Sequence, residues 1–324
     1  MVSGTSIPAH QSKSAGVLGL RGSAAGEARL MSTKLRQAWL RAAALIGVRS
    51  FVARSGLGHP FVCHIGDFLG ENPFYNRQAF RVELELCAAW LREETNPLVF
   101  DVGANVGFWA THLVQMIDSS QTRVFAFEPV AETVAKLVSS ISKLGLEAQV
   151  LVVAAAVADH SRPVRLSYSP QRSLFAQVEN DGPNRRAGDR TVYSASVTLD
   201  AFSEIFGLLP SLIKVDIEGS EIAALRGAMN LLACDERPCL MFEFNPETLS
   251  EMKDAPSDFA NLLGGYLLFY VDDFSGQIRP IGDSVTSLGE IDWVCNLFAV
   301  PNDIHSISRW ERALAATRSR MREG

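Results

Sequence analysis

The feature that most constrains the fold of this chain is a regular alternation of short apolar runs with stretches of helical periodicity. The apolar runs predict buried strands over 98–100, 124–127, 149–153, 212–215 and 240–244. The stretches between them predict helices over 108–117, 130–144, 221–232 and 257–263. Strands that alternate with helices form βαβ units with right-handed crossovers. The pattern therefore predicts an α/β fold with a doubly wound, mostly parallel sheet.

Two later apolar runs, 266–271 and 293–300, have no helical pattern between them. Neighbouring strands without a crossover helix pair in antiparallel fashion. We therefore expect an antiparallel edge that completes a sheet of seven strands.

The segments on either side of this region suggest four parts of the chain. We expect an unstructured N-terminus over 1–31, a helical extension over 32–95, an α/β domain over 96–305 and a solvated basic helix over 306–324. A polar stretch over 169–190 lacks either periodicity, which is typical of a functional lid or a disordered insertion. Four arginines of this stretch could bind an acidic acceptor, although we expect them to be exposed to solvent. They are Arg172, Arg185, Arg186 and Arg190.

A basic amphipathic helix is predicted over 34–50. Its apolar residues recur at helical spacing: Leu35, Trp39, Ala42 and Ile46. Such a helix either packs its apolar stripe on its own domain or lies on a membrane surface. We expect the first arrangement.

Composition excludes several classes of function. The 30 Lys and Arg residues are outnumbered by 36 Asp and Glu residues, so nucleic acid is not an expected partner. No apolar run approaches the roughly 18 residues of a membrane span. The five cysteines are widely spaced and form no CxxC pair. They predict buried thiols in a reducing compartment, the cytoplasm, and no zinc site.

The strongest chemical signal is the segment VFDVGANVGF at 99–108. A buried strand ends in Asp101 and leads through Gly103 and Gly107 into a helix. Glycine permits a positive φ and lets a ligand approach the backbone, and the start of a helix offers free N–H groups. Open α/β sheets bind their ligands at such strand ends.

Two acids and an asparagine indicate which ligand this is. A dinucleotide fingerprint GxGxxG has glycine where this chain has Asn105, and an acid at a strand end suits a cation better than a phosphate. Glu128 ends the second strand, where a carboxylate accepts the hydroxyls of a ribose. A ribose without pyrophosphate, joined to a cationic amino-acid end, describes S-adenosylmethionine. The alternative is an oxidoreductase that binds a dinucleotide, and Asn105 argues against it.

A third motif, KVDIEGSE at 214–221, closes the fourth strand. Alternation along a strand places Lys214 and Asp216 on the same side. A buried carboxylate at a strand end needs a partner, so we expect Asp216 in the active site, with Glu218 as a further candidate.

DVGANVG, AFEP and KVDIEGSE, in this order and spacing, resemble the FkbM-type family of S-adenosylmethionine-dependent methyltransferases. The resemblance extends from about Arg81 to Pro301. It implies a class I, Rossmann-like methyltransferase fold with S-adenosyl-L-methionine as cofactor. It also implies O-methylation of a hydroxyl on a small-molecule or glycan acceptor.

The resemblance further implies roles for individual residues. It assigns the methionine moiety to Asp101, Gly103, Asn105 and Gly107, the ribose to Glu128, and the neighbourhood of adenine to Ala155 and Ala156. Asp216 would lie beside the cofactor. Many methyltransferases have Asp or Asn where this chain has the two alanines, so adenine recognition would depend on backbone or shape contacts.

Methyl transfer from a sulfonium is an in-line displacement, in which the protein mainly aligns donor and acceptor. A hydroxyl acceptor also needs a general base, for which Asp216, Glu243 at the end of the fifth strand, and Glu218 are the candidates. With Asn245, the carboxylates of Asp216 and Glu243 could ligate Mg²⁺, but we expect hydrogen bonding and no metal. The alternative to an enzyme is a non-catalytic module that binds S-adenosylmethionine or a protein partner.

Overall fold

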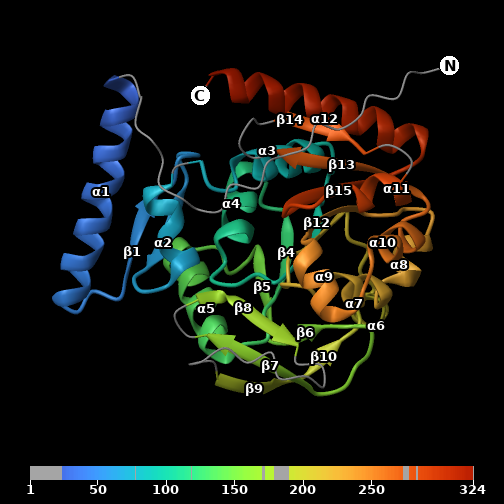
Figure 1. Ribbon diagram of the computed structural model, residues 1–324, viewed down its shortest axis with the longest axis horizontal. Coiled ribbons are helices and arrows are strands. Elements are labelled where there is room, and N and C mark those ends of the chain that lie inside the picture. Colours follow the sequence, from blue (N-terminus) through green and yellow to red (C-terminus); the bar gives the residue numbers. More distant parts are fainter. Residues whose placement is uncertain are drawn as a thin grey trace.

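The computed structural model of the chain describes residues 24–76, 78–117, 119–169, 172–178, 190–272, 277–281 and 284–323. A central sheet of eight strands organises the molecule (Figure 1). The order across the sheet is β14 (Gln277–Pro280), β13 (Tyr266–Asp272), β15 (Cys295–Pro301), β12 (Cys239–Phe244), β11 (Leu212–Val215), β3 (Leu98–Val102), β4 (Arg123–Phe127) and β5 (Val150–Val153).

The five strands from β12 to β5 are parallel. Strand β15 runs antiparallel to both β12 and β13, and β14 runs antiparallel to β13. The predicted α/β fold with a mostly parallel sheet and an antiparallel edge is confirmed. The sheet has eight strands where seven were expected, because β14 is a short, mostly exposed strand with no apolar run to reveal it.

Helices cover both faces of the sheet (Figure 1). One face is packed by α3 (Arg81–Leu91), α4 (Phe108–Ile117), α5 (Ala131–Leu144) and α12 (Ile304–Glu323). The other is packed by α6 (Leu199–Phe206), α7 (Glu221–Arg226), α8 (Met229–Ala233), α9 (Pro246–Met252), α10 (Pro256–Leu262) and α11 (Ser284–Gly289). The helix predicted over 221–232 is two short helices separated at Gly227, where a Cβ would lie 2.2 Å from the carbonyl oxygen of Ala158.

The basic C-terminal helix was expected to be solvated, and this prediction is wrong for one of its faces. Trp310, Ala313 and Thr317 of α12 are buried. Three arginines of the same helix form ion pairs with glutamates in or just after α3: Arg309 with Glu94, Arg312 with Glu93 and Arg320 with Glu85. Glutamates in or just after α3 thus neutralise part of the positive charge of α12. The apolar face of α12 completes the core.

At the N-terminal side, helix α1 (Ala24–Leu45) begins inside the segment expected to be unstructured, 1–31. The remainder of that segment, 1–23, lies outside the described residues. Helix α1 packs against a hairpin of β1 (Ser50–Arg54) and β2 (Pro60–His64) and against α2 (Phe68–Tyr75), at the outer edge of the molecule (Figure 1).

The side of α1 that faces the protein is not the predicted one. Leu40 and Ala43 are buried, whereas Leu35, Trp39 and Ile46 are exposed. The expectation that the apolar stripe packs on its own domain is therefore wrong for Leu35, Ala42 and Ile46, whereas the half-exposed ring of Trp39 packs on Phe51 and Phe74. The spacing identified the stripe correctly, but Leu40 and Ala43 are the buried apolar residues of the helix.

The polar stretch over 169–190 contains strands as well as loop. Strand β7 (Val164–Ser169) pairs with β8 (Arg172–Val178) and β9 (Arg190–Ser194) in a small antiparallel sheet. A parallel pair of β6 (Ala156–Val157) and β10 (Ser196–Val197) flanks it in sequence. Residues 170–171 and 179–189, and the side chain of Arg172, lie outside the description, so the roles expected for Arg172, Arg185 and Arg186 are not addressed. Arg190 forms an exposed ion pair with Glu132.

Of the five cysteines, Cys63, Cys87, Cys239 and Cys295 are buried, as expected, and Cys234 is half-buried. Within the described part of the chain, no helix combines the length and the apolar character needed to cross a membrane.

Candidate functional site

A cavity opens at the carboxyl ends of β3, β4 and β11, where the sequence predicted a ligand site. Its empty volume, part of which is open to solvent, is about 640 Å³. Six residues predicted to contact a cofactor line it: Gly103, Asn105, Glu128, Ala155, Ala156 and Asp216. Leu69 of α2 and Leu166 of β7 also line the cavity. No sequence signal marked these two, because they come from segments far from the motifs.

Asp101 and Gly107, also predicted beside the cofactor, do not line the cavity. The side chain of Asp101 is fully buried and lies beside Lys214. At Gly107, φ is +86° and a Cβ would lie 2.5 Å from Cδ1 of Leu137. This glycine therefore lets α4 pack closely on α5.

A buried ammonium joins the ends of the two neighbouring strands β3 and β11. The Nζ atom of Lys214 lies 3.3 Å from Asp101 and 3.3 Å from Asp216, which confirms that Lys214 and Asp216 share one side of the strand. Burial by itself lowers the pKa of Lys214, but the charges of Asp216 and Asp101 outweigh that effect and raise it. Burial raises the pKa of Asp101, and Lys214 opposes this shift. The three groups together carry one negative charge when all are ionised.

Glu128 is buried at the end of β4, where its carboxylate fixes two turns. It accepts hydrogen bonds from the backbone N–H groups of Asn105, at 3.1 Å, and Val130, at 2.9 Å. Burial raises the pKa of Glu128 to about 7, although both hydrogen bonds act in the opposite direction. Asn105 itself adopts a left-handed conformation with φ of 50°. The carboxylate of Glu128 thus shapes the glycine-rich turn and also borders the cavity.

The turn after β11 is held by Glu221 at the start of α7. The Glu221 carboxylate accepts hydrogen bonds from the backbone N–H groups of Ile217 and Gly219, at 2.9 to 3.1 Å. Burial raises the pKa of Glu221 to about 7, and these hydrogen bonds oppose the shift. Glu218, between them, has a φ of 55°, in the left-handed region that side chains with a Cβ adopt at a cost.

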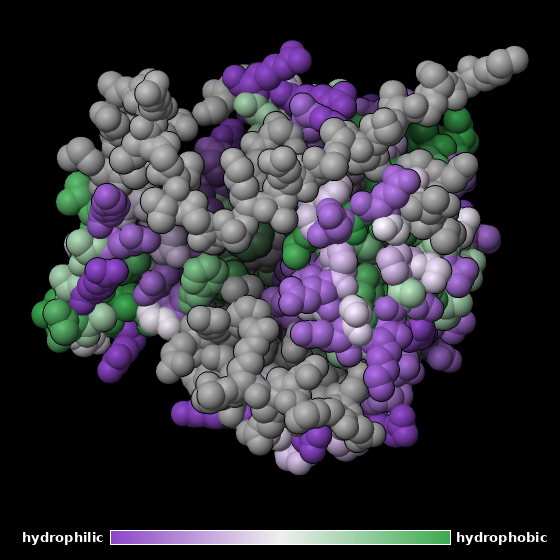
Figure 2. All heavy atoms as spheres, viewed as in Figure 1, coloured by the Kyte–Doolittle hydropathy of each residue, from purple (hydrophilic) through white to green (hydrophobic). Residues whose placement is uncertain are grey.

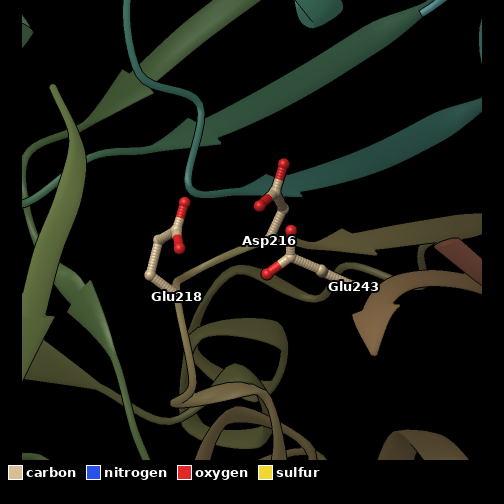
Figure 3. Close-up of side chains that lie close together, drawn as sticks. All are labelled: Asp216, Glu218 and Glu243. Atoms are coloured by element: carbon tan, nitrogen blue, oxygen red, sulfur yellow. The ribbon is translucent and has the colours of Figure 1, made fainter. Parts of the chain in front are cut away.

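Three carboxylates converge at the ends of β11 and β12 (Figure 3). One oxygen from each of Asp216, Glu218 and Glu243 lies within 4.8 Å of the others. We call this group the acidic cluster. Burial raises the pKa of Glu243, and the charges of Asp216 and Glu221 raise it further, against the effect of Lys214. Such a cluster can hold a proton, a cationic group or a metal ion.

Asn245, considered with Asp216 and Glu243 as a possible Mg²⁺ ligand, has another role. Its Oδ1 accepts hydrogen bonds from the backbone N–H groups of Glu247, at 3.1 Å, and Thr248, at 3.4 Å. This is the N-cap of α9. Glu218 takes the third place in the acidic cluster instead.

A smaller recess of about 360 Å³ adjoins the main cavity across Gly103, Asn105 and Asp216. Phe80, Phe108 and Trp109 form its apolar wall, and Lys214 forms part of its polar side. The two hollows thus place chemically different surfaces side by side.

The strand order, the helices on both faces and the site at the strand ends define a class I, Rossmann-like methyltransferase fold. The family model described as the methyltransferase FkbM domain matches residues 101–269, which are 169 of the 324 residues. The chain therefore belongs to the FkbM family of methyltransferases, whose methyl donor is S-adenosyl-L-methionine. No curated protein matches the chain.

Several solved structures are distantly similar to the chain. An FkbM methyltransferase from Methylobacillus flagellatus is 16% identical with a TM-score of 0.40, over 71% of this chain and 52% of that chain. A SAM-dependent methyltransferase from Agrobacterium tumefaciens is 10% identical with a TM-score of 0.41, over 78% and 69%. An O-methyltransferase from Bacillus cereus in complex with SAH is 12% identical with a TM-score of 0.34, over 68% and 80%. The chain thus spans about half of the length of the first of these proteins.

Proposed function

We propose that this chain transfers a methyl group from S-adenosylmethionine to a hydroxyl of a small molecule or glycan. The observation that carries the proposal is the position of the acidic cluster. Asp216 and Glu218 of the cluster line the cavity together with Glu128 and the glycine-rich turn, and an oxygen of Glu243 lies within 4.8 Å of theirs. A base for the acceptor and a cradle for the donor are thus neighbours.

The residues of the two hollows fit the cofactor. S-adenosylmethionine is cationic at its sulfonium and ammonium groups, and the site is acidic. The smaller recess, with Asn105 and Asp216, suits the methionine end, and Glu128 suits the ribose hydroxyls. Ala155, Ala156 and Leu166 offer an apolar surface of the right kind for adenine. The cofactor supplies a methyl group that is already activated as a sulfonium.

The residues of the chain then have two tasks, alignment and proton removal. Lys214 holds Asp216 at the edge of the cavity, and Glu221 fixes the turn that carries Glu218. We assign the acceptor proton to Glu243, because burial raises the pKa of this carboxyl and makes it a stronger base for a hydroxyl, or to Asp216, which lines the cavity. A cation bound in the cavity would keep the receiving carboxylate ionised until the acceptor arrives.

The test is transfer of radiolabelled methyl groups from S-adenosylmethionine to a panel of sugars and hydroxylated metabolites. We expect transfer to at least one hydroxyl acceptor. Glu243→Gln and Asp216→Asn should lower kcat by about 10²–10⁴-fold while changing the cofactor Kd by less than about tenfold. Glu247→Gln, an exposed acid in the first turn of α9, is the matched control. Cofactor binding without transfer to any acceptor would favour the non-catalytic alternative, and unchanged kcat in both variants would remove the assigned base.

A further inference from the structure

The outer face of α1 carries apolar side chains that are largely exposed. The exposed fractions of Leu35, Trp39 and Ile46 are 67%, 48% and 82%. Ala42 lies on the same face, and Leu45, next to it, is 89% exposed. We call Leu35, Trp39, Ala42, Leu45 and Ile46 the α1 stripe. Figure 2 shows hydrophobic residues at the outer edge of the molecule. Figure 1, in the same view, shows one end of α1 at that position.

This face is held firmly in place. Leu40 and Ala43, on the side of the helix that faces the protein, are buried. The ring of Trp39 meets Phe51 of β1 edge-on at 4.7 Å and lies 5.8 Å from the ring of Phe74 in α2. Trp39 therefore anchors one edge of the α1 stripe to the protein, and Leu35, Ala42, Leu45 and Ile46 are exposed.

Basic residues accompany the α1 stripe. Between residues 28 and 66 the chain has six basic residues and no acidic one, although its formal net charge is −6: Arg29, Lys34, Arg36, Arg41, Arg49 and Arg54. Lys34 and Arg41 are exposed and, being seven residues apart, lie on one flank of the stripe. Arg49, just after the helix, is also exposed. Positive charge is thus concentrated beside the exposed apolar surface.

We propose that α1 docks on an anionic lipid surface, with the helix axis parallel to the surface. In that position the α1 stripe would enter the boundary between headgroups and acyl chains, while Lys34, Arg41 and Arg49 would contact lipid phosphates. Trp39, half exposed and amphipathic, suits the interfacial layer. The helix would dock as a peripheral element, which agrees with the lack of a spanning helix among the described residues.

Two other occupants fit this face less well. A second copy packed through the same face would bring Lys34 and Arg41 of both copies together, and like charges in an interface oppose association. Nucleic acid would use the basic residues but not the apolar ones, because most of its contacts are to phosphate and sugar. An anionic lipid surface uses both kinds of side chain.

The test is flotation of the full chain with vesicles of phosphatidylcholine, alone or mixed with phosphatidylglycerol. We expect binding to the mixed vesicles that is at least tenfold stronger than to the neutral ones and that falls as salt is added. Leu35→Glu combined with Ile46→Glu should weaken binding about tenfold or more, and Lys34→Gln combined with Arg41→Gln at least fivefold.

Each variant has a matched control at an equally exposed position elsewhere. Ile205→Glu, on α6 and 74% exposed, and the pair Arg318→Gln and Arg322→Gln, on α12, should leave binding unchanged. Thermal unfolding by circular dichroism checks that all variants are folded. The proposal is overturned if mixed vesicles do not bind, if the stripe variant binds as well as the original chain, or if sedimentation shows a dimer that the stripe variant dissociates. None of these readouts depends on methyl transfer.

Discussion

Two neighbouring regions of the site use the same kind of side chain in different ways. At the ends of β3 and β4, Asp101 lies beside the ammonium of Lys214, and Glu128 accepts two backbone N–H groups. At the ends of β11 and β12, three carboxylates gather within 4.8 Å, and Asp216 is the member of the described cluster that pairs with Lys214. The first region therefore uses carboxylates to stabilise the fold and shape a cavity. The second keeps negative charge in excess, available to a cation or a proton.

The largest expected effect comes from removing the cation that the two regions share. Lys214→Met would leave Asp101 buried without a counter-charge, so the free energy of unfolding should fall by about 3–5 kcal/mol. Chemical denaturation measures this loss. Adding Asp101→Asn to the same variant should restore part of the stability, because the second change removes the uncompensated charge. An unchanged free energy of unfolding in Lys214→Met would contradict the role given to the buried pair.

The next effect concerns cofactor affinity and belongs to the first region. Glu128→Ala should weaken S-adenosylmethionine binding by about 10–100-fold, since hydrogen bonds to a charged group contribute roughly 1.5–3 kcal/mol. Titration calorimetry measures the change. Glu128→Gln, which retains the shape of the side chain, tests whether charge matters, and Glu132→Ala, at an exposed acid of α5, is the control. Equal losses in Glu128→Ala and Glu132→Ala would show that the ribose assignment is wrong.

Comparison of the original chain with Glu243→Gln at several pH values should isolate Glu243 of the second region from Glu128 of the first, because burial also raises the pKa of Glu128, to about 7. A carboxyl group whose pKa is raised on folding binds extra protons in the folded state, so its contribution to stability is lost as pH rises toward the folded pKa. The pKa of Glu243 is raised to about 8. Between pH 6.5 and 8, the free energy of unfolding of the original chain should therefore fall by roughly 1–2 kcal/mol more than that of Glu243→Gln.

The choice of this pH range avoids an opposing effect. Burial lowers the pKa values of His64 and His112 to about 4. Their contribution to stability rises with pH only up to the ordinary histidine pKa of about 6.5. Thermal unfolding of the two proteins at several pH values above 6.5 gives the comparison. Parallel curves would mean that Glu243 does not carry the extra proton.

The smallest effect concerns the backbone of the acidic cluster. Glu218 has a φ of 55°, so Glu218→Gly should stabilise the fold by up to about 1 kcal/mol while lowering methyl transfer. Lys253→Gly is a matched control, because Lys253 ends α9 with a φ of 63° away from the cavity. It should give a similar gain in stability and no loss of transfer. Loss of stability in Glu218→Gly alone would mean that the side chain of Glu218 stabilises its turn.

The fold was largely predictable because its central strands are short apolar runs that end in glycine-rich or acidic turns. Where a segment lacks such a run, as β14 does, no sequence pattern predicts a strand. Helix α1 shows a different limit. Periodicity identifies an apolar stripe, but the contact with the protein depends on Leu40 and Ala43, which only the packing of α1 on α2 and the hairpin selects.

The site was predictable where its residues follow strand ends, as Asp216 and Glu128 do. Leu69 and Leu166 reach the cavity from distant segments, and no local pattern could indicate them. Asp101 shows that a strand-end acid can also point away from the cavity, toward Lys214, because alternation fixes the side of a strand but not the distance to a ligand. The roles of the cavity residues in binding and transfer remain predictions.

The most direct test of the account is isothermal titration of the purified chain with S-adenosylmethionine, S-adenosylhomocysteine and NAD⁺. We predict micromolar binding of the first two ligands, none of NAD⁺, and binding about 10–100-fold weaker in Glu128→Ala. Absence of binding for all three ligands, or binding of NAD⁺ alone, would contradict a methyl-donor site at the ends of β3, β4 and β11.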